Sequence, residues 1–205
     1  MNQEKVWDEI AEQWNNFRQS PFRDVSIEFE RILNKIKPGK ILDLGCGNCR
    51  NLLPFAKKDF ECYGIDFSKK MLEYAEKYSK KNNFKVKLKK ARLEKIPFKK
   101  ESFDYLLSIA TLHHLNKKDQ KKAVNEMFRI LKKEGIALVS VWNKWPFSLI
   151  IKNKYEKWKK NNKEYYRYYY WFTPLEIKKL FQQNGFNVLD LKKDKNIILI
   201  VQKPK

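Results

Sequence analysis

Apolar residues in the first part of the chain recur every three to four positions, which predicts a helix over residues 6–17. The residues of this apolar face are Val6, Ile10, Trp14 and Phe17. A second helix is predicted over residues 24–36, with Asp24 as its N-cap, because Pro38-Gly39 then ends the periodic pattern. Together they form a helical segment, residues 1–37, ahead of the first strand.

From Lys40 onward, short apolar runs alternate with helical patterns. The runs predict strands over residues 40–45, 60–66, 84–91, 102–110 and 136–142. The helical patterns cover residues 51–58, 68–81 and 117–133, with Ser68 as an N-cap and Gly135 as a terminator. Strands that alternate with helices favour a parallel sheet covered by helices on both faces. Its right-handed crossovers place the loops that follow the strands at one edge, where such sheets bind ligands.

The pattern changes after Trp142. Residues 143–172 are crowded with aromatic and basic side chains, which favours RNA binding, because bases stack on aromatic rings and cations follow phosphates. An amphipathic lid helix with some aromatic residues in the core is the competing interpretation, and the two can coexist. A helix starting at Thr173-Pro174 and strands over 186–193 and 196–203 then predict a terminal hairpin. The fold class is therefore α/β: a Rossmann-like, doubly wound, mostly parallel seven-stranded sheet with a C-terminal antiparallel hairpin. We expect one domain, residues 1–205, with a core at 40–142, an insertion at 143–172 and a terminal unit at 173–205.

Composition indicates what kind of partner the protein binds and in which compartment it works. The 205 residues contain no apolar run long enough to span a membrane and no secretion-signal core near the start. Only three cysteines are present, which favours the reducing cytoplasm over a disulfide framework. The formal net charge of +21 attracts polyanions such as nucleic acid. Lysines spread along the whole chain also fit adaptation to heat, so charge alone leaves both interpretations open.

The stretch "ILDLGCGNCRN", residues 41–51, has three interpretations. Cys46 and Cys49 form C-x-x-C, but no second ligand pair is close in sequence, so we predict no metal site. A thioredoxin-like redox pair is also disfavoured, because Asp43 and Gly45 precede the cysteines rather than a Trp or Pro context. The dinucleotide fingerprint G-x-G-x-x-G is incomplete, because Arg50 replaces its third glycine. The pattern Asp43-x-Gly45-x-Gly47 is joined by Asp66 at the end of the second strand, where an acid can accept ribose hydroxyls. Asp43 would repel a pyrophosphate and attract an ammonium group, which favours S-adenosylmethionine.

Four ordered motifs resemble the class I S-adenosylmethionine-dependent methyltransferases over about residues 40–142. They are "ILDLGCGNCRNL", "GIDFSKKML", "IPFKKESFDYLLSIATLHHL" and "MFRILKKEGIALVSVW". The resemblance implies a set of cofactor contacts: Asp43 for the amino group, Gly45 and Gly47 for the methionine moiety, Asp66 for the ribose, Arg92 and Leu93 beside the adenine, and Ala110 near the methyl donor. Arg92 departs from the family, which commonly has Asp there, and Cys49 replaces a usual small residue.

The flanking segments, including "VWDEIAEQWNNFRQSPF" and "YYRYYYWFTPLEIKKLF", resemble methyltransferases of the transfer-RNA wobble uridine. That resemblance implies esterification of a carboxymethyl group on uridine 34. It also implies a small zinc-binding activator protein as a partner. The predicted third strand, 84–91, would be an edge strand available for pairing with it.

The acceptor side is inferred from residue types. The candidates are His113 and His114 after the fourth strand, Arg18 as a carboxylate clamp, and Trp142, Asn143, Arg167 and Tyr168 as substrate contacts. An ionised carboxylate would need no general base, so positioning would carry much of the catalysis. Simple packing of the histidines and Trp142, and a solvated Arg18, are the competing interpretations. A small-molecule methyltransferase and a catalytically idle RNA-binding subunit are the alternative functions.

Overall fold

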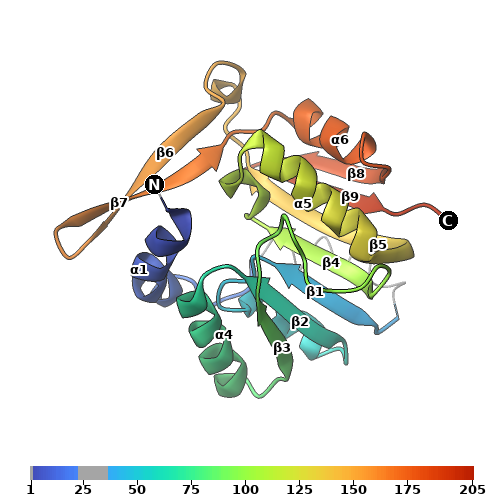
Figure 1. Cartoon of the computed structure of the whole chain (residues 1–205), viewed down its shortest axis with the longest axis horizontal. Helices are drawn as coiled ribbons and strands as arrows, with labels where there is room; N and C mark the ends of the chain where they lie inside the picture. The colour runs from blue at the N-terminus through green and yellow to red at the C-terminus, as the bar shows by residue number, and fades with distance from the viewer. Residues whose placement is uncertain (1, 23–36) are drawn as a thin grey trace.

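The computed structural model describes residues 2–22 and 37–205 (Figure 1). Helix α1, Gln3–Asn16, forms where its apolar face predicts it and buries Val6 and Ile10. Asn2 caps this helix, because its side chain accepts a hydrogen bond from the Lys5 backbone N–H. The helix predicted over 24–36 lies outside the described residues.

Seven strands form one sheet in the order β3-β2-β1-β4-β5-β9-β8. The strands are β1 (Lys40–Leu44), β2 (Glu61–Asp66), β3 (Val86–Lys90), β4 (Phe103–Ile109), β5 (Leu131–Trp142), β8 (Asn187–Lys193) and β9 (Asn196–Gln202). The first five are parallel, and β9 and β8 add an antiparallel hairpin. This architecture confirms the predicted fold class, and β3 is an edge strand as expected.

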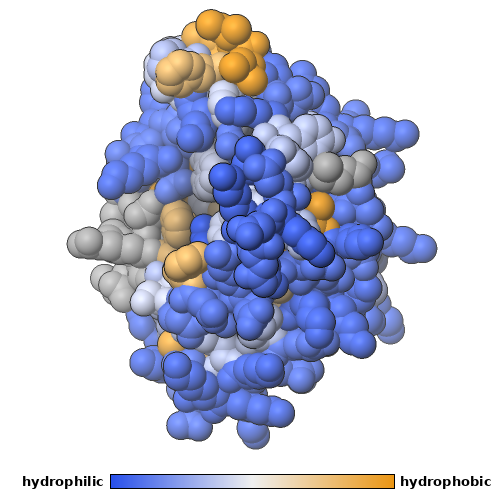
Figure 2. All heavy atoms as spheres, turned by 90° about the vertical axis from the view of Figure 1, so that its left-hand side faces the viewer, coloured by the Kyte–Doolittle hydropathy of each residue, from blue (hydrophilic) through white to orange (hydrophobic). Residues whose placement is uncertain are grey.

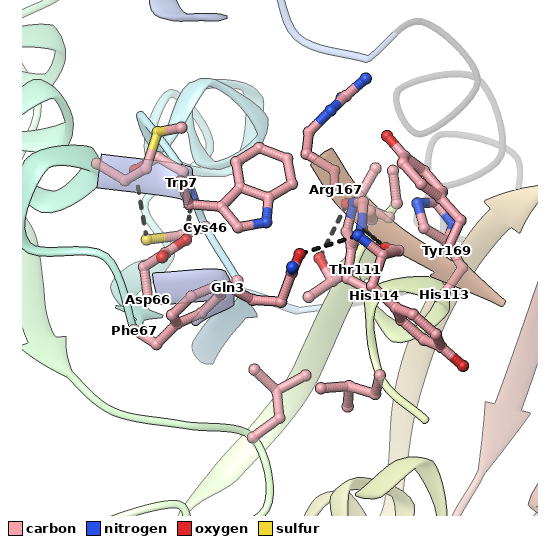
Figure 3. A pocket seen from close by; sticks show the side chains of 18 of the residues that line it. Gln3, Trp7, Cys46, Asp66, Phe67, Thr111, His113, His114, Arg167 and Tyr169 are labelled. Atoms are coloured by element: carbon pink, nitrogen blue, oxygen red, sulfur yellow. Dashed lines mark hydrogen bonds between the residues drawn. The ribbon is translucent and has the colours of Figure 1, made fainter. Parts of the chain in front are cut away.

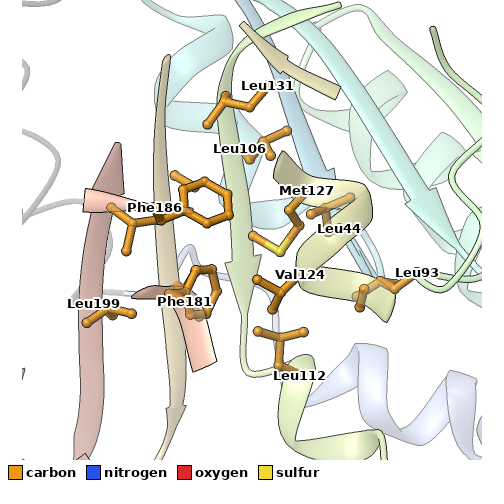
Figure 4. Packing of buried hydrophobic residues seen from close by; sticks show 14 of the residues in the cluster. Leu44, Leu93, Leu106, Leu112, Val124, Met127, Leu131, Phe181, Phe186 and Leu199 are labelled. Atoms are coloured by element: carbon orange, nitrogen blue, oxygen red, sulfur yellow. The ribbon is translucent and has the colours of Figure 1, made fainter. Parts of the chain in front are cut away.

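Successive residues of the central strands serve opposite faces of the sheet, as the two-residue strand period requires. Leu42 and Leu106 pack on one face with helices α5 (Lys117–Ile130) and α6 (Pro174–Gln182), as Figure 4 shows for Leu106, Met127 and Phe181. Ile41 and Leu107 pack on the other face, with side chains of α3 (Leu53–Ala56) and α4 (Lys69–Lys81). Both faces of the sheet are therefore covered by helices, so a ligand can reach the central strands only at their ends.

Two predicted helices are shorter than expected. The helix predicted over 117–133 ends at Ile130, because Leu131 is already extended and pairs with Phe103 as the first residue of β5. Gly135 therefore lies within a strand rather than after a helix. The helix predicted over 51–58 divides into a 3-10 turn, Arg50–Leu52, and α3, with Pro54 in its first turn.

The aromatic and basic insertion is largely a β-hairpin, not a lid helix. Strands β6 (Asn153–Lys160) and β7 (Lys163–Tyr170) form a separate two-stranded sheet that projects from the body of the protein beside α1 (Figure 1). Asn161 and Asn162 connect them with positive φ angles of 47° and 57°, as a two-residue hairpin turn requires. Short 3-10 turns, Leu112–His114 and Phe147–Leu149, complete the described elements. No described helix is long and apolar enough to cross a membrane.

Candidate active site

A cavity of about 440 Å³ lies at the carboxyl ends of the five parallel strands, bordered by α1 and β7. The predicted site residues that line it are Arg18, Gly45, Gly47, Asp66, Arg92, Leu93, Ala110, His113, His114, Trp142, Arg167 and Tyr168. Figure 3 shows Cys46, Asp66 and Phe67 on one side, with both histidines, Arg167 and Tyr169 on the other. The fold therefore places the predicted cofactor residue Asp66 across the cavity from the predicted acceptor residues His113, His114 and Arg167.

The loop after β1 needs both of its glycines. Gly45 and Gly47 have positive φ angles of 71° and 54°, and a side chain on Gly45 would overlap that of Thr111. A Cβ on Gly47 would lie 2.8 Å from the Trp14 ring. The Gly45 N–H donates to the Ile65 carbonyl at 2.8 Å, which fixes the loop against β2. The backbone of Gly45 and Gly47 therefore borders the cavity without side chains, so a ligand can approach it closely.

Two buried carboxyl groups lie at the ends of β1 and β2. Asp66 accepts hydrogen bonds from the backbone N–H groups of Gly47, at 3.0 Å, and Ser68, at 2.9 Å. Burial nevertheless raises the pKa of Asp66 to about 6. Asp43 does not line the cavity, and neither of its carboxyl oxygens has a hydrogen-bond partner. Burial, with the nearby Asp66, raises the pKa of Asp43 to about 7, so this site favours a cation.

The three cysteines, Cys46, Cys49 and Cys62, are buried and unbridged. Cys49 adopts a left-handed conformation, with a φ of 64°, where the loop turns into the 3-10 helix. Burial raises the pKa of the Cys49 thiol, which makes it a poor nucleophile. In residues 2–22 and 37–205, no cluster of three or more His, Cys, Asp or Glu side chains is arranged to hold a metal ion.

The residues after β3 and β4 border the middle of the cavity. Arg92 Nη1 lies 3.7 Å from Glu4 and Arg92 Nε lies 3.6 Å from Glu94, so these acids partly balance its charge. The Arg92 guanidinium also lies over the Phe67 ring, 5.5 Å from its centre. Ala110 has a φ of 54°, which directs the chain from β4 toward the histidines.

His113 and His114 are held in opposite tautomers. His113 Nδ1 accepts a hydrogen bond from the Trp142 N–H at 3.2 Å, so its hydrogen is on Nε2. His114 Nδ1 donates to the Tyr168 carbonyl at 2.9 Å, which leaves a lone pair on Nε2. Burial lowers the pKa of His113 well below its usual range and that of His114 to about 3. Both rings are therefore neutral at physiological pH.

Three arginines that line the cavity alternate with two tryptophan rings, of which only Trp14 lines the cavity. The Arg50 and Arg18 guanidiniums both lie over the Trp14 ring, 5.3 and 5.1 Å from its centre. Trp158 in turn contacts Arg18, at 5.8 Å, and Arg167, at 4.7 Å. Burial, with the nearby Arg18, lowers the pKa of Arg50 to about 10. Among the described residues, none of these three arginines has a carboxylate within ion-pair distance.

The substrate contacts predicted around β5 divide into two groups. Trp142 lines the cavity and stacks on Tyr169 at a centroid distance of 4.5 Å, and Tyr168 also lines it. Asn143 does not. Its side chain donates to the Asp194 carbonyl at 2.7 Å and accepts from the Trp145 N–H at 3.1 Å, so it organises the loop after β5. The expectation that Asn143 lines the acceptor pocket is wrong.

Residues 41–135 match the family model described as a methyltransferase domain. The chain is similar to a ubiquinone biosynthesis O-methyltransferase of Bartonella tribocorum, with 25% identity over 87% of this chain and 74% of that protein. It is also similar to the tRNA (carboxymethyluridine(34)-5-O)-methyltransferase alkbh8 of Xenopus tropicalis, with 30% identity over 67% of this chain and 20% of that protein. A solved SAM-dependent methyltransferase structure from Methanosarcina mazei has a TM-score of 0.73 at 21% identity, and the match covers 84% of this chain and 96% of that one.

Residues 41–135 are a methyltransferase domain. The fold is that of the class I S-adenosylmethionine-dependent methyltransferases, and S-adenosylmethionine is the cofactor that this fold implies. The residues of the methyltransferase fit this molecule. The glycine loop leaves room for the methionine chain, and Asp66, which lines the cavity, is available to ribose hydroxyls. Asp43 lies outside the lining, so its expected contact with the ammonium group stays a prediction. When bound, the cofactor supplies a methyl group on a positively charged sulfur.

Three residues that line the cavity of the methyltransferase were not singled out from its sequence. In the sequence, Arg50 is marked only as the residue that interrupts a dinucleotide motif, yet it lines the cavity and its buried Nε has no hydrogen-bond partner among the described residues. Trp7 packs against His114 at a centroid distance of 4.9 Å. Gln3 joins α1 to β7, because its amide accepts from the Tyr168 N–H and donates to the Tyr166 carbonyl. The apolar period of α1 could have identified Trp7, but no sequence signal marks Gln3.

Proposed function

We propose that the protein transfers a methyl group from S-adenosylmethionine to the wobble uridine of transfer RNA, where it esterifies a carboxymethyl-type group. The observation that carries this proposal is a pair of buried N–H donors without partners. Arg167 Nε and His113 Nε2 are both buried and make no hydrogen bond, although both residues line the cavity. An unpartnered buried donor costs about 1–3 kcal/mol, so a ligand that accepts from both would be strongly favoured.

The geometry around Tyr169 favours an anionic ligand. The His113 ring stacks on Tyr169 at 5.1 Å, and the Arg167 guanidinium lies 5.3 Å from the centre of the same ring. The two donors therefore flank one side chain. Because His113 is neutral with its hydrogen on Nε2, it can donate a hydrogen bond without repelling Arg167. A carboxylate, with two oxygens in one plane, matches a guanidinium and a second N–H donor.

This chemistry requires little of the protein besides positioning. A carboxylate is ionised near neutral pH, so its oxygen can attack the methyl group without losing a proton. The low pKa values of both histidines are consistent with a role in hydrogen bonding rather than in proton transfer. Arg18 shares the Trp14 ring with Arg50 and the Trp158 ring with Arg167, so it lies between these two arginines. It would bind the acceptor carboxylate or the adjoining part of the substrate. Fixing the acceptor oxygen in line with the methyl group then supplies most of the rate enhancement.

Transfer RNA as the acceptor is supported by bulk charge and by one relative. The net charge of +21 favours a polyanion, and the printed name of the Xenopus relative specifies carboxymethyluridine at position 34. Small-molecule methylation is the second candidate, because the Bartonella relative is named for ubiquinone biosynthesis and the cavity volume suits a small ligand.

A zinc-binding activator stays a prediction for the exposed edge of β3, and light scattering of the mixed proteins would test it.

Mass spectrometry of transfer RNA nucleosides after incubation with isotopically labelled cofactor tests the main proposal. We expect the label in a wobble-uridine methyl ester, which mild alkali then releases as methanol. Two RNA stem–loops that differ only in a carboxymethyl or a carbamoylmethyl group on the uridine provide the matched comparison, and only the acid should accept the label. Label found only in small metabolites, or equally in both stem–loops, would refute the proposal.

A further inference from the structure

The β6–β7 hairpin is held firmly by its inner face. On that face, Trp158 Nε1 donates to Gln13 Oε1 at 2.6 Å, and Lys160 Nζ donates to the Glu9 carbonyl at 2.7 Å. The Tyr165 hydroxyl donates to Glu9 at 3.3 Å. Because the inner face and the inner edge are occupied by α1 and by the side chain of Gln3, the hairpin has a fixed direction relative to the cavity.

The outer face of the hairpin is exposed on β6 from Tyr155 toward the turn, whereas Tyr170 at its base is buried in the core. The strand register places Tyr155 opposite Tyr168, Lys157 opposite Tyr166, and Lys159 opposite Glu164. Tyr155 and Tyr168 line the mouth of the cavity, and Tyr155 is 52% exposed, so its ring is accessible. Lys157 and Lys159 follow in steps of roughly 7 Å toward the turn. This outer face therefore runs from the cavity to the tip as an aromatic ring followed by two exposed cations.

Charge favours a polyanion on this face. Residues 153–170 contain six basic and two acidic residues. Lys157 forms an exposed ion pair with Glu164 at 2.8 Å, whereas Lys159 has no ion pair in the part of the chain that the structure describes. Figure 2 views the side toward which the hairpin projects, and hydrophilic residues cover most of it. Single-stranded nucleic acid is bound by this combination, because bases stack on exposed aromatic rings while lysines follow the phosphates.

We propose that the outer face of the hairpin binds the unpaired RNA that flanks the target nucleotide, with a base stacked on Tyr155 and backbone phosphates at Lys157 and Lys159. This inference rests on the proposed function for the identity of the target nucleotide, but RNA binding itself does not require methyl transfer. Lysines on an outer strand also prevent pairing with other proteins, and the experiment separates these two roles.

Fluorescence anisotropy with a labelled RNA stem–loop, at several salt concentrations and without cofactor, measures the interaction. The test variant is Lys157→Gln/Lys159→Gln. Its matched control is Lys99→Gln/Lys100→Gln, which removes the same charge from an exposed segment before β4, at the amino-terminal end of that strand. We expect the slope of log affinity against log salt to fall by about 1.4 in the test variant, and Kd near physiological salt to rise roughly tenfold. The control should change both much less.

Tyr155→Ala should weaken binding of the stem–loop by about fivefold or more and leave binding of a fully paired RNA unchanged. Circular dichroism establishes that the variants fold. Equal effects of the two double variants, or an unchanged salt slope, would overturn the proposal. Self-association of Lys157→Gln/Lys159→Gln with unaltered RNA affinity would assign the lysines to edge protection instead. If the protein methylates the wobble uridine but the hairpin variants bind RNA normally, only this inference is refuted. If the hairpin variants bind RNA weakly but no wobble-uridine product forms, only the proposed function is refuted.

Discussion

Replacing Asp43 with asparagine should stabilise the cofactor-free protein above neutral pH. Burial raises the pKa of Asp43 from 3.8 to about 7, and no group in the described structure donates a hydrogen bond to its carboxyl. Between those pH values, the folded protein keeps a proton that the unfolded chain has lost, so stability falls as pH rises toward the folded pKa and then levels off. At pH 8 the cost is about 4 kcal/mol, and at pH 5 it is under about 2 kcal/mol. The asparagine side chain would avoid this cost because it stays neutral.

Urea unfolding at pH 5 and pH 8, followed by circular dichroism, tests this reasoning. The stability gain of Asp43→Asn should be larger at pH 8 by about 2–3 kcal/mol, a substantial part of a typical folding free energy. Asp194→Asn, on the exposed turn between β8 and β9, makes the same chemical change outside the core and is the matched control. Calorimetry should also find weaker S-adenosylmethionine binding by Asp43→Asn. If Asp43→Asn were less stable than the wild type at pH 8, the buried carboxylate would have a stabilising partner, and the reasoning would fail.

Three further substitutions test the site and the fold. Arg167→Lys keeps the charge but loses the planar guanidinium, so kcat/KM for the acceptor should fall roughly tenfold or more, with unchanged cofactor affinity by calorimetry; unchanged acceptor kinetics would contradict its role. Gly45→Ala should abolish cofactor binding and lower the unfolding free energy by about 1–3 kcal/mol, because the methyl group would overlap Thr111 at a positive φ. Thr173→Ala removes the capping box with Glu176 and should cost about 1–2 kcal/mol in urea unfolding, with cofactor affinity unaffected.

The sheet was predictable because each central strand alternates between two buried faces. This pattern can be recognised from a short stretch of sequence. In β1 and β4, neighbouring residues pack into the two hydrophobic clusters on opposite faces of the sheet. The end of α5 was predicted too late, because Lys132 and Lys133 continue a helical pattern although burial of Leu131 against the sheet determines the conformation. Tertiary packing therefore overrides helix propensity at this boundary.

The β6–β7 hairpin was missed for a different physical reason. Its strands form no sheet with the main core, so they lack the apolar alternation by which strands are usually found. Asn161-Asn162, with alternating aromatic and basic residues on either side, was the available signal, since Asn tolerates the positive φ of a hairpin turn. The strands are instead stabilised by polar contacts with α1, which a periodicity analysis does not detect.

The motifs predicted the cofactor side of the cavity better than the acceptor side. Asp43, Gly45 and Asp66 belong to two adjacent parallel strands and the turns that follow them, so short sequence patterns bring them together. The row of arginines instead depends on α1, the turn after β1 and β7, which are far apart in sequence. Their juxtaposition has an electrostatic consequence that no single motif carries. The charges of Asp43 and Arg18 both act on Arg50, so Arg50 connects the buried acids beside the glycine loop with the arginines near α1 and on β7. On the proposed function, methyl transfer to a carboxylate removes the acceptor's negative charge, which weakens the attraction of the ester product for the arginines.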